Sequence, residues 1–168
     1  QVAEELKREC PELSTFVTLS PVPGFRRWIT GRSSSEALAP QDRLIVETLA
    51  MGADLPRETL DAASGPIRRA AAAYLLTARG ASGQPRDPVQ RFHLGNGARL
   101  ERINLAADLS PKGADESLGV MVNYLYDLAT IEANHERFAQ YGEVVLSQAL
   151  QREFSSLMAR RNPAVAAR

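Results

Sequence analysis

The chain has 168 residues, enough for one domain or for part of a larger protein. Its 20 Lys and Arg residues balance its 20 Asp and Glu residues, so net charge gives no argument for binding nucleic acid or an anionic membrane, and no apolar run approaches the roughly 18 residues of a membrane-spanning helix. One cysteine, Cys10, allows no disulfide within the chain and indicates a reducing compartment, so we expect a cytoplasmic location and leave a mitochondrial one open.

The start of the chain reads as the middle of a helix. Residue 1 is Gln, and no capping residue precedes the helical pattern of residues 1–9. Pro11 ends this pattern. We therefore expect a truncated chain that begins inside a helix, with part of its fold upstream.

The first half of the chain predicts one strand followed by helices. Residues 14–20 are rich in β-branched and aromatic side chains and predict a buried strand. Two prolines and a glycine then force a non-helical exit. A short helix is expected at residues 25–31 and a Ser-rich loop at 33–39. Further helices are expected at residues 41–52, 57–63 and 67–79.

The second half predicts two more strands. Residues 80–88, rich in Gly and Pro, predict a loop that leads to His93. Gly-Asn-Gly at residues 95–97 predicts a turn. Strands are expected at 100–106 and 118–126, a loop or single helical turn at 108–113, and helices at 128–141 and 143–160.

Three strands among at least six helices predict an α+β fold. Three strands are few for so many helices, so we expect missing upstream strands to complete a mixed sheet flanked by helices. The expected organisation is one domain piece over residues 1–160 and a flexible tail over residues 161–168.

His93 is the first candidate for chemistry, because it stands directly before a sharp turn into a predicted strand. A histidine that only packs or caps would explain the same position. The second histidine, His135, lies on the polar face of a predicted helix and is interpreted as a solvated surface residue. Two histidines and one cysteine without ligand spacing predict no metal site.

Ser20 is the second candidate, because it ends a predicted strand. A nucleophile elbow carries glycines two positions before and two after its serine. Thr18 and Val22 occupy those positions here. A serine that caps the following helix or bonds within the turn is therefore the simpler interpretation.

Four segments carry a likeness to a known family. They read Phe-Val-Thr-Leu-Ser-Pro-Val-Pro-Gly-Phe at 16–25, Pro-Val-Gln-Arg-Phe-His-Leu-Gly-Asn-Gly-Ala at 88–98, Arg-Ile-Asn at 102–104 with Ala-Asp at 107–108, and Gly-Val-Met-Val-Asn-Tyr-Leu-Tyr at 119–126. In these segments and their order the chain resembles the C-terminal catalytic domain of the malonyl-CoA decarboxylase family. The first two segments contain its specific motifs, and the likeness runs nearly the length of the chain.

The resemblance implies a GCN5-related N-acetyltransferase fold behind an N-terminal helical domain through which the enzyme forms homo-oligomers. It implies conversion of malonyl-CoA to acetyl-CoA and carbon dioxide, in fatty-acid and malonate metabolism, without a metal or organic cofactor. The family's serine near the substrate carboxylate matches Ser20, its proton-donating histidine matches His93, and its site tyrosine matches Tyr126. Leu105 stands where the family commonly has tryptophan, which changes packing more than chemistry.

These matches lead to expected roles. His93 would protonate C2 of the enolate, and Ser20 would hydrogen-bond the leaving carboxylate. Asn96 and Asn104, close to His93 in sequence, are expected to orient its ring and to help bind the substrate.

Three alternatives stay open at this point. One is an acyltransferase of the same fold that uses His93 as a base. Another is a hydrolase with Ser20 as nucleophile, which predicts a covalent acyl-enzyme. The third is an inactive fragment, because the family's CoA-binding glycine loop is expected upstream of residue 1.

Overall fold

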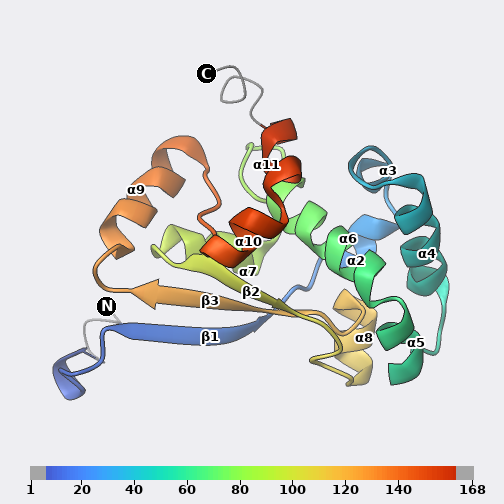
Figure 1. Ribbon diagram of the computed structural model, residues 1–168, viewed down its shortest axis with the longest axis horizontal. Helices are drawn as coiled ribbons and strands as arrows, with labels where there is room; N and C mark the ends of the chain where they lie inside the picture. Colours follow the sequence, from blue (N-terminus) through green and yellow to red (C-terminus); the bar gives the residue numbers. More distant parts are fainter. Residues whose placement is uncertain (1–6, 162–168) are drawn as a thin grey trace.

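The computed structural model describes residues 7–161, so the first residues of the predicted opening helix and the tail at 162–168 lie outside the described part. Figure 1 labels its elements, which are β1 (Thr15–Pro21), α2 (Phe25–Ile29), α3 (Arg32–Ala37), α4 (Pro40–Met51), α5 (Arg57–Ala62), α6 (Ser64–Thr77), α7 (Pro88–Gly95), β2 (Arg99–Asn104), α8 (Pro111–Ser117), β3 (Met121–Asp127), α9 (Ile131–Tyr141), α10 (Gln148–Glu153) and α11 (Ser155–Arg161). The predicted α+β class is confirmed. No helix among residues 7–161 is long and apolar enough to cross a membrane.

The three strands form one sheet in the order β1-β3-β2. Strand β3 pairs antiparallel with both neighbours, with Ser20 opposite Val122 and Thr18 opposite Tyr124. The prediction of a mixed sheet is therefore wrong for the strands described. The parallel pairing that the structure contains is an isolated bridge from Leu100 to Leu146, outside the named strand pairs.

The core lies between one face of the sheet and the helices. Figure 1 shows α6, α7 and α10 on the same side of the sheet. Phe25, Trp28 and Tyr74 are buried there, and their ring centroids lie 5.3 to 6.5 Å apart. The buried alanines of α6 at residues 70–73 let neighbouring elements approach its backbone closely.

Strand β1 is not the buried strand that its composition predicted. Val17 and Leu19 are 62% and 57% exposed. Side chains alternate along a strand, so these two project from the face opposite Ser20. Exposed and less exposed side chains alternate along β1, so one face of the strand is uncovered and half of its side chains stay accessible.

Two helices lie where none was predicted. Helix α7 occupies residues for which no helix was predicted; Asp87 caps it by accepting the Gln90 N–H, and Pro88 stands in its first turn. Helix α3 replaces the predicted loop at 33–39. The buried Ser34 hydroxyl there bonds to the carbonyls of Ile29 and Gly31, which satisfies it away from water.

Two further boundaries differ from the prediction. Helix α8 is longer than the single turn expected, because Ser110 caps it and Pro111 begins it. The single helix predicted for 143–160 is divided into α10 and α11. The Ser147 hydroxyl accepts the Leu150 N–H and caps α10, which leaves residues 143–147 outside any helix.

Candidate active site

Strand β1 and helix α7 bring the two main candidates together. Ser20 is 5% exposed, and His93 in the last turn of α7 is 8% exposed. The Ser20 Oγ and His93 Nε2 atoms lie 3.0 Å apart, although 73 residues separate them in sequence. Gly24, and no serine side chain, stands at the N-cap of α2, so the interpretation of Ser20 as a helix cap is wrong.

Two tyrosines on the inner face of β3 hold the His93 ring. The ring stacks on Tyr124 with centroids 4.4 Å apart and an interplanar angle of 18°. Its Nδ1 atom lies 2.7 Å from the Tyr126 hydroxyl. Both ring nitrogens are therefore hydrogen-bonded, and the plane of the ring is fixed by the stacking.

The predicted turn after His93 secures the end of α7. The N–H of Gly97 donates to the carbonyl of Leu94, and the N–H of Ala98 donates to that of His93. Gly97 has φ +83°, a left-handed conformation that glycine adopts without strain. The backbone of the site is therefore fixed on both sides of the turn.

Burial controls the protonation of the site. Removal from water lowers the pKa of His93 below its ordinary value of 6.5, because the charged imidazolium is disfavoured. Burial raises the pKa of the Tyr126 phenol, which keeps its proton. Near neutral pH the ring is neutral, so one of its nitrogens donates a hydrogen bond and the other accepts one.

Thr18 and Tyr124 belong to this site but were not predicted as parts of it. The Thr18 Oγ1 and Ser20 Oγ atoms lie 3.0 Å apart. The signal that could have found them is the period of two along a strand, which places Thr18 on the Ser20 face and Tyr124 on the Tyr126 face.

The two asparagines do not orient the His93 ring, contrary to prediction. Asn96 donates to the carbonyl of Phe92, and Asn104 donates to the side chain of Asn123. Proximity in sequence misleads here because the ring reaches across to β1 and β3 for its partners. That Asn96 and Asn104 contact the substrate stays a prediction.

His135 is exposed, as predicted, but it also connects two helices. Its Nδ1 atom lies 2.7 Å from the carbonyl oxygen of Gly95 at the end of α7. Since a carbonyl only accepts, His135 donates this bond. It therefore joins α9 to the carboxyl end of the helix that carries His93.

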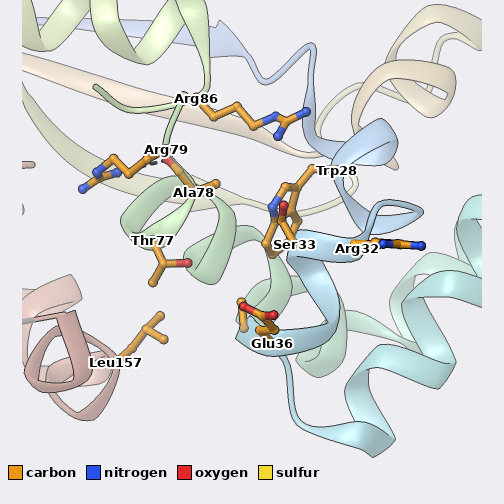
Figure 2. Close-up of a pocket in the computed structure, with 10 residues that line it drawn as sticks. Trp28, Arg32, Ser33, Glu36, Thr77, Ala78, Arg79, Arg86 and Leu157 are labelled. Atoms are coloured by element: carbon orange, nitrogen blue, oxygen red, sulfur yellow. Dashed lines mark hydrogen bonds between the residues drawn. The ribbon is translucent and has the colours of Figure 1, made fainter. Parts of the chain in front are cut away.

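A cavity of about 500 Å³ lies apart from the Ser20–His93 pair, between α3, the end of α6 and α11. Trp28 lines this cavity, and Figure 2 shows the side chains of Arg32 and Arg79 pointing in opposite directions. These two guanidinium groups therefore do not converge on a common anion position. Neither Ser20 nor His93 is among the residues that line this cavity.

A family model described as the malonyl-CoA decarboxylase C-terminal domain matches residues 1–164. The mitochondrial malonyl-CoA decarboxylase of Anser anser anser is 34% identical over 158 residues, which cover 80% of this chain and 31% of that protein. The protein of the same name from Rattus norvegicus is 36% identical over 150 residues, which cover 76% of this chain and 30% of that protein. The chain thus spans less than a third of the length of these relatives.

Solved structures agree with this result. The crystal structure of malonyl-CoA decarboxylase from Rhodopseudomonas palustris matches with a TM-score of 0.78 and 45% identity, over 90% of this chain and 36% of that one. The structure from Agrobacterium vitis matches with a TM-score of 0.76 and 45% identity, over 94% of this chain and 39% of that one.

Proposed function

The chain belongs to the malonyl-CoA decarboxylase C-terminal domain family, and from this premise we propose that it carries the catalytic serine and histidine of an enzyme that converts malonyl-CoA to acetyl-CoA and carbon dioxide. The observation that supports this most strongly is the buried contact between Ser20 and His93, with Tyr126 behind the ring. The activity of the whole enzyme is part of the proposal, because the chain covers about a third of its relatives.

The reaction needs an electron sink and a proton donor. The bond between the carboxylate carbon and C2 breaks, carbon dioxide leaves, and the electron pair forms an enolate conjugated with the thioester. C2 of the enolate then takes a proton and becomes the methyl group of acetyl-CoA. A site from which water is excluded favours the first step, because the carboxylate loses hydration that stabilises its charge.

Ser20 and His93 suit these two tasks. The Ser20 hydroxyl would donate a hydrogen bond to the carboxylate and hold it out of the thioester plane. His93 in its imidazolium form would give a proton to C2, and a malonyl carboxylate beside the ring would favour that form. The backbone amides near Leu19 and Ser20 are proposed to face the thioester oxygen.

The partner of His93 Nδ1 favours a decarboxylase over a serine hydrolase. In a hydrolase triad a buried carboxylate stabilises the imidazolium that forms when the histidine removes the serine proton. Here the partner is the Tyr126 phenol, which burial keeps neutral. A neutral partner stabilises the imidazolium less, so Ser20 is a weak candidate for a nucleophile, and no covalent acyl-enzyme is expected by mass spectrometry.

The remaining features follow from the family and stay proposals. They are a fold of the GCN5-related N-acetyltransferase type, residues 1–160 as part of a catalytic domain, no cofactor beyond the CoA of the substrate, and homo-oligomers through an upstream helical domain. The proposed cytoplasmic location rests instead on the single cysteine. The goose and rat relatives are mitochondrial by name. Cell fractionation with an antibody against the natural protein would test the location.

Product analysis tests the proposed function. Malonyl-CoA given to the natural full-length protein without any acceptor should yield acetyl-CoA and carbon dioxide in equal amounts. An acyltransferase of the same fold would stay idle until an amine or thiol acceptor was added. Dependence of the reaction on such an acceptor would overturn the proposal.

Replacing Ser20 by Ala should lower kcat by about 10- to 100-fold. A hydrogen bond to a charged group contributes roughly 1.5–3 kcal/mol, and about 1.4 kcal/mol corresponds to tenfold in rate. Steady-state kinetics with malonyl-CoA would measure the effect. An increase in KM alone, at unchanged kcat, would make Ser20 a uniform binder of substrate and contradict its proposed role.

The pH profiles of kcat/KM and kcat should differ. His93 must be protonated to act as the acid, and burial lowers its pKa in the free protein, so kcat/KM should fall as pH rises through a value below 6.5. A malonyl carboxylate next to the ring favours the imidazolium and raises that pKa, so kcat should fall at higher pH than kcat/KM. Profiles that coincide, or a kcat/KM that rises with pH, would count against His93 as the proton donor.

A further inference from the structure

The Ser20 hydroxyl lies between two polar neighbours. Its Oγ atom is 3.0 Å from Thr18 Oγ1 and 3.0 Å from His93 Nε2. A serine hydroxyl carries one proton and two lone pairs. If either neighbour accepted that proton, none would remain for a carboxylate in the site.

The direction of the hydrogen bond between the Tyr126 hydroxyl and Nδ1 decides which ring nitrogen carries the proton. When the Tyr126 hydroxyl donates to Nδ1, the neutral imidazole carries its proton on Nε2. The Nε2–H group then donates to Ser20 Oγ and occupies the first lone pair. The second lone pair is available to the Thr18 hydroxyl.

We propose that Thr18 is a positioning residue that donates its hydroxyl proton to Ser20 Oγ and thereby reserves the Ser20 proton for the malonyl carboxylate. This inference rests on the proposed function. Both lone pairs of Ser20 Oγ are then filled by protein donors. The one remaining polar bond that Ser20 can make is the donation to the substrate.

The strand holds Thr18 in place for this task. Its side chain is half-buried on the inner face of β1, and its carbonyl accepts a bond of 2.9 Å from the Asn123 side chain. Thr15 lies on the same strand but on the outer, exposed face. Thr15 therefore provides a control for the same chemical change away from the site.

Thr18→Val in the natural full-length protein should lower kcat by about three- to tenfold and leave KM nearly unchanged, as expected for the loss of one neutral hydrogen bond. Valine keeps the β-branched shape of threonine, so the melting temperature should stay close to that of the wild type. Thr18→Ser restores a donor and should recover most of the activity. The kcat and KM of Thr15→Val should match those of the wild type.

The double variant separates positioning from packing. If Thr18 acts through the Ser20 hydroxyl, Thr18→Val should have no further effect once Ser20 is Ala. An equal loss in both backgrounds would show that Thr18 contributes independently of Ser20, and would overturn the inference. So would a Thr18→Val enzyme with wild-type kcat.

A measurement that needs no turnover completes the test. ¹⁵N NMR of histidine-labelled protein reports which nitrogen of the neutral His93 ring carries the proton, and His135→Asn identifies the signals. The inference requires the proton on Nε2. A proton on Nδ1 would mean that Ser20 gives its own proton to the ring, which would exclude the proposed role. A wild-type enzyme that releases no carbon dioxide would refute the proposed function, and the NMR result would still decide the hydrogen-bond pattern.

Discussion

Replacing His93 by Asn in the natural full-length protein should lower kcat for malonyl-CoA by about 10²- to 10⁴-fold, the range typical of general acid–base catalysis. The Asn side chain can keep a bond toward Tyr126, but it has no group that can give a proton to C2 near neutral pH. It also cannot reach Ser20 as the ring does at 3.0 Å. Steady-state kinetics of the purified variant would measure the loss.

His135→Asn is the matched control, since His135 is exposed on α9 and the Asn amide can still donate to the Gly95 carbonyl oxygen. It should leave turnover close to that of the wild type. Melting temperatures of both variants would separate a loss of chemistry from a loss of folding, because the His93 ring packs on Tyr124. A loss of less than about tenfold for a folded His93→Asn protein would refute the role of His93 as proton donor.

Gly97→Ala should destabilise the protein by about 2–5 kcal/mol. An alanine at φ +83° costs roughly 1–2 kcal/mol, and its Cβ would come too close to the backbone carbonyl oxygen of Ile131, an overlap that typically costs a further 1–3 kcal/mol. The relief of this overlap must move the turn that holds the end of α7. Because His93 lies in the last turn of that helix, kcat should fall as well.

Gly83→Ala separates the two causes. Gly83 has φ +79°, but an added Cβ there would meet nothing within 4 Å. Gly83→Ala should therefore lower the free energy of unfolding only by the conformational cost, about 1–2 kcal/mol, and leave turnover normal. Urea unfolding would compare the two variants, and equal destabilisation would mean that the contact with Ile131 contributes nothing.

The strands could be predicted from sequence because their signals are local. Alternation and β-branched residues located β1, β2 and β3 to within a few residues. Burial was less predictable, because the exposure of Val17 and Leu19 depends on which face of the sheet is covered. An isolated strand carries no information about which of its faces is covered.

The helices that were not predicted begin at local sequence signals. Asp87 with Pro88, and Ser110 with Pro111, are both a capping residue followed by proline at the first helical position. Ser147 is likewise a capping residue, although Gln148 and not proline follows it, and it places the start of α10 later than the predicted start at residue 143. These boundaries were therefore available from sequence.

Only part of the site could be predicted from sequence. The pairing of Ser20 and His93 was suggested by two motifs, and the structure places the two side chains in hydrogen-bonding contact. The contacts of the ring with Tyr124 and Tyr126 depend on the register of β3 against β1 and on the rotation of α7. Such contacts follow from tertiary packing, which the sequence around His93 does not determine. The asparagines were chosen by sequence proximity and bond elsewhere.

The fate of the free carboxylate carbon tests the central claim most directly. Malonyl-CoA labelled with ¹³C in that carboxylate should give labelled carbon dioxide and unlabelled acetyl-CoA in equal amounts, without an acceptor, when it reacts with the wild-type protein. The His93→Asn protein should form both products far more slowly. Labelled malonate together with free CoA would instead show that the thioester is hydrolysed, and would contradict a decarboxylase built on Ser20 and His93.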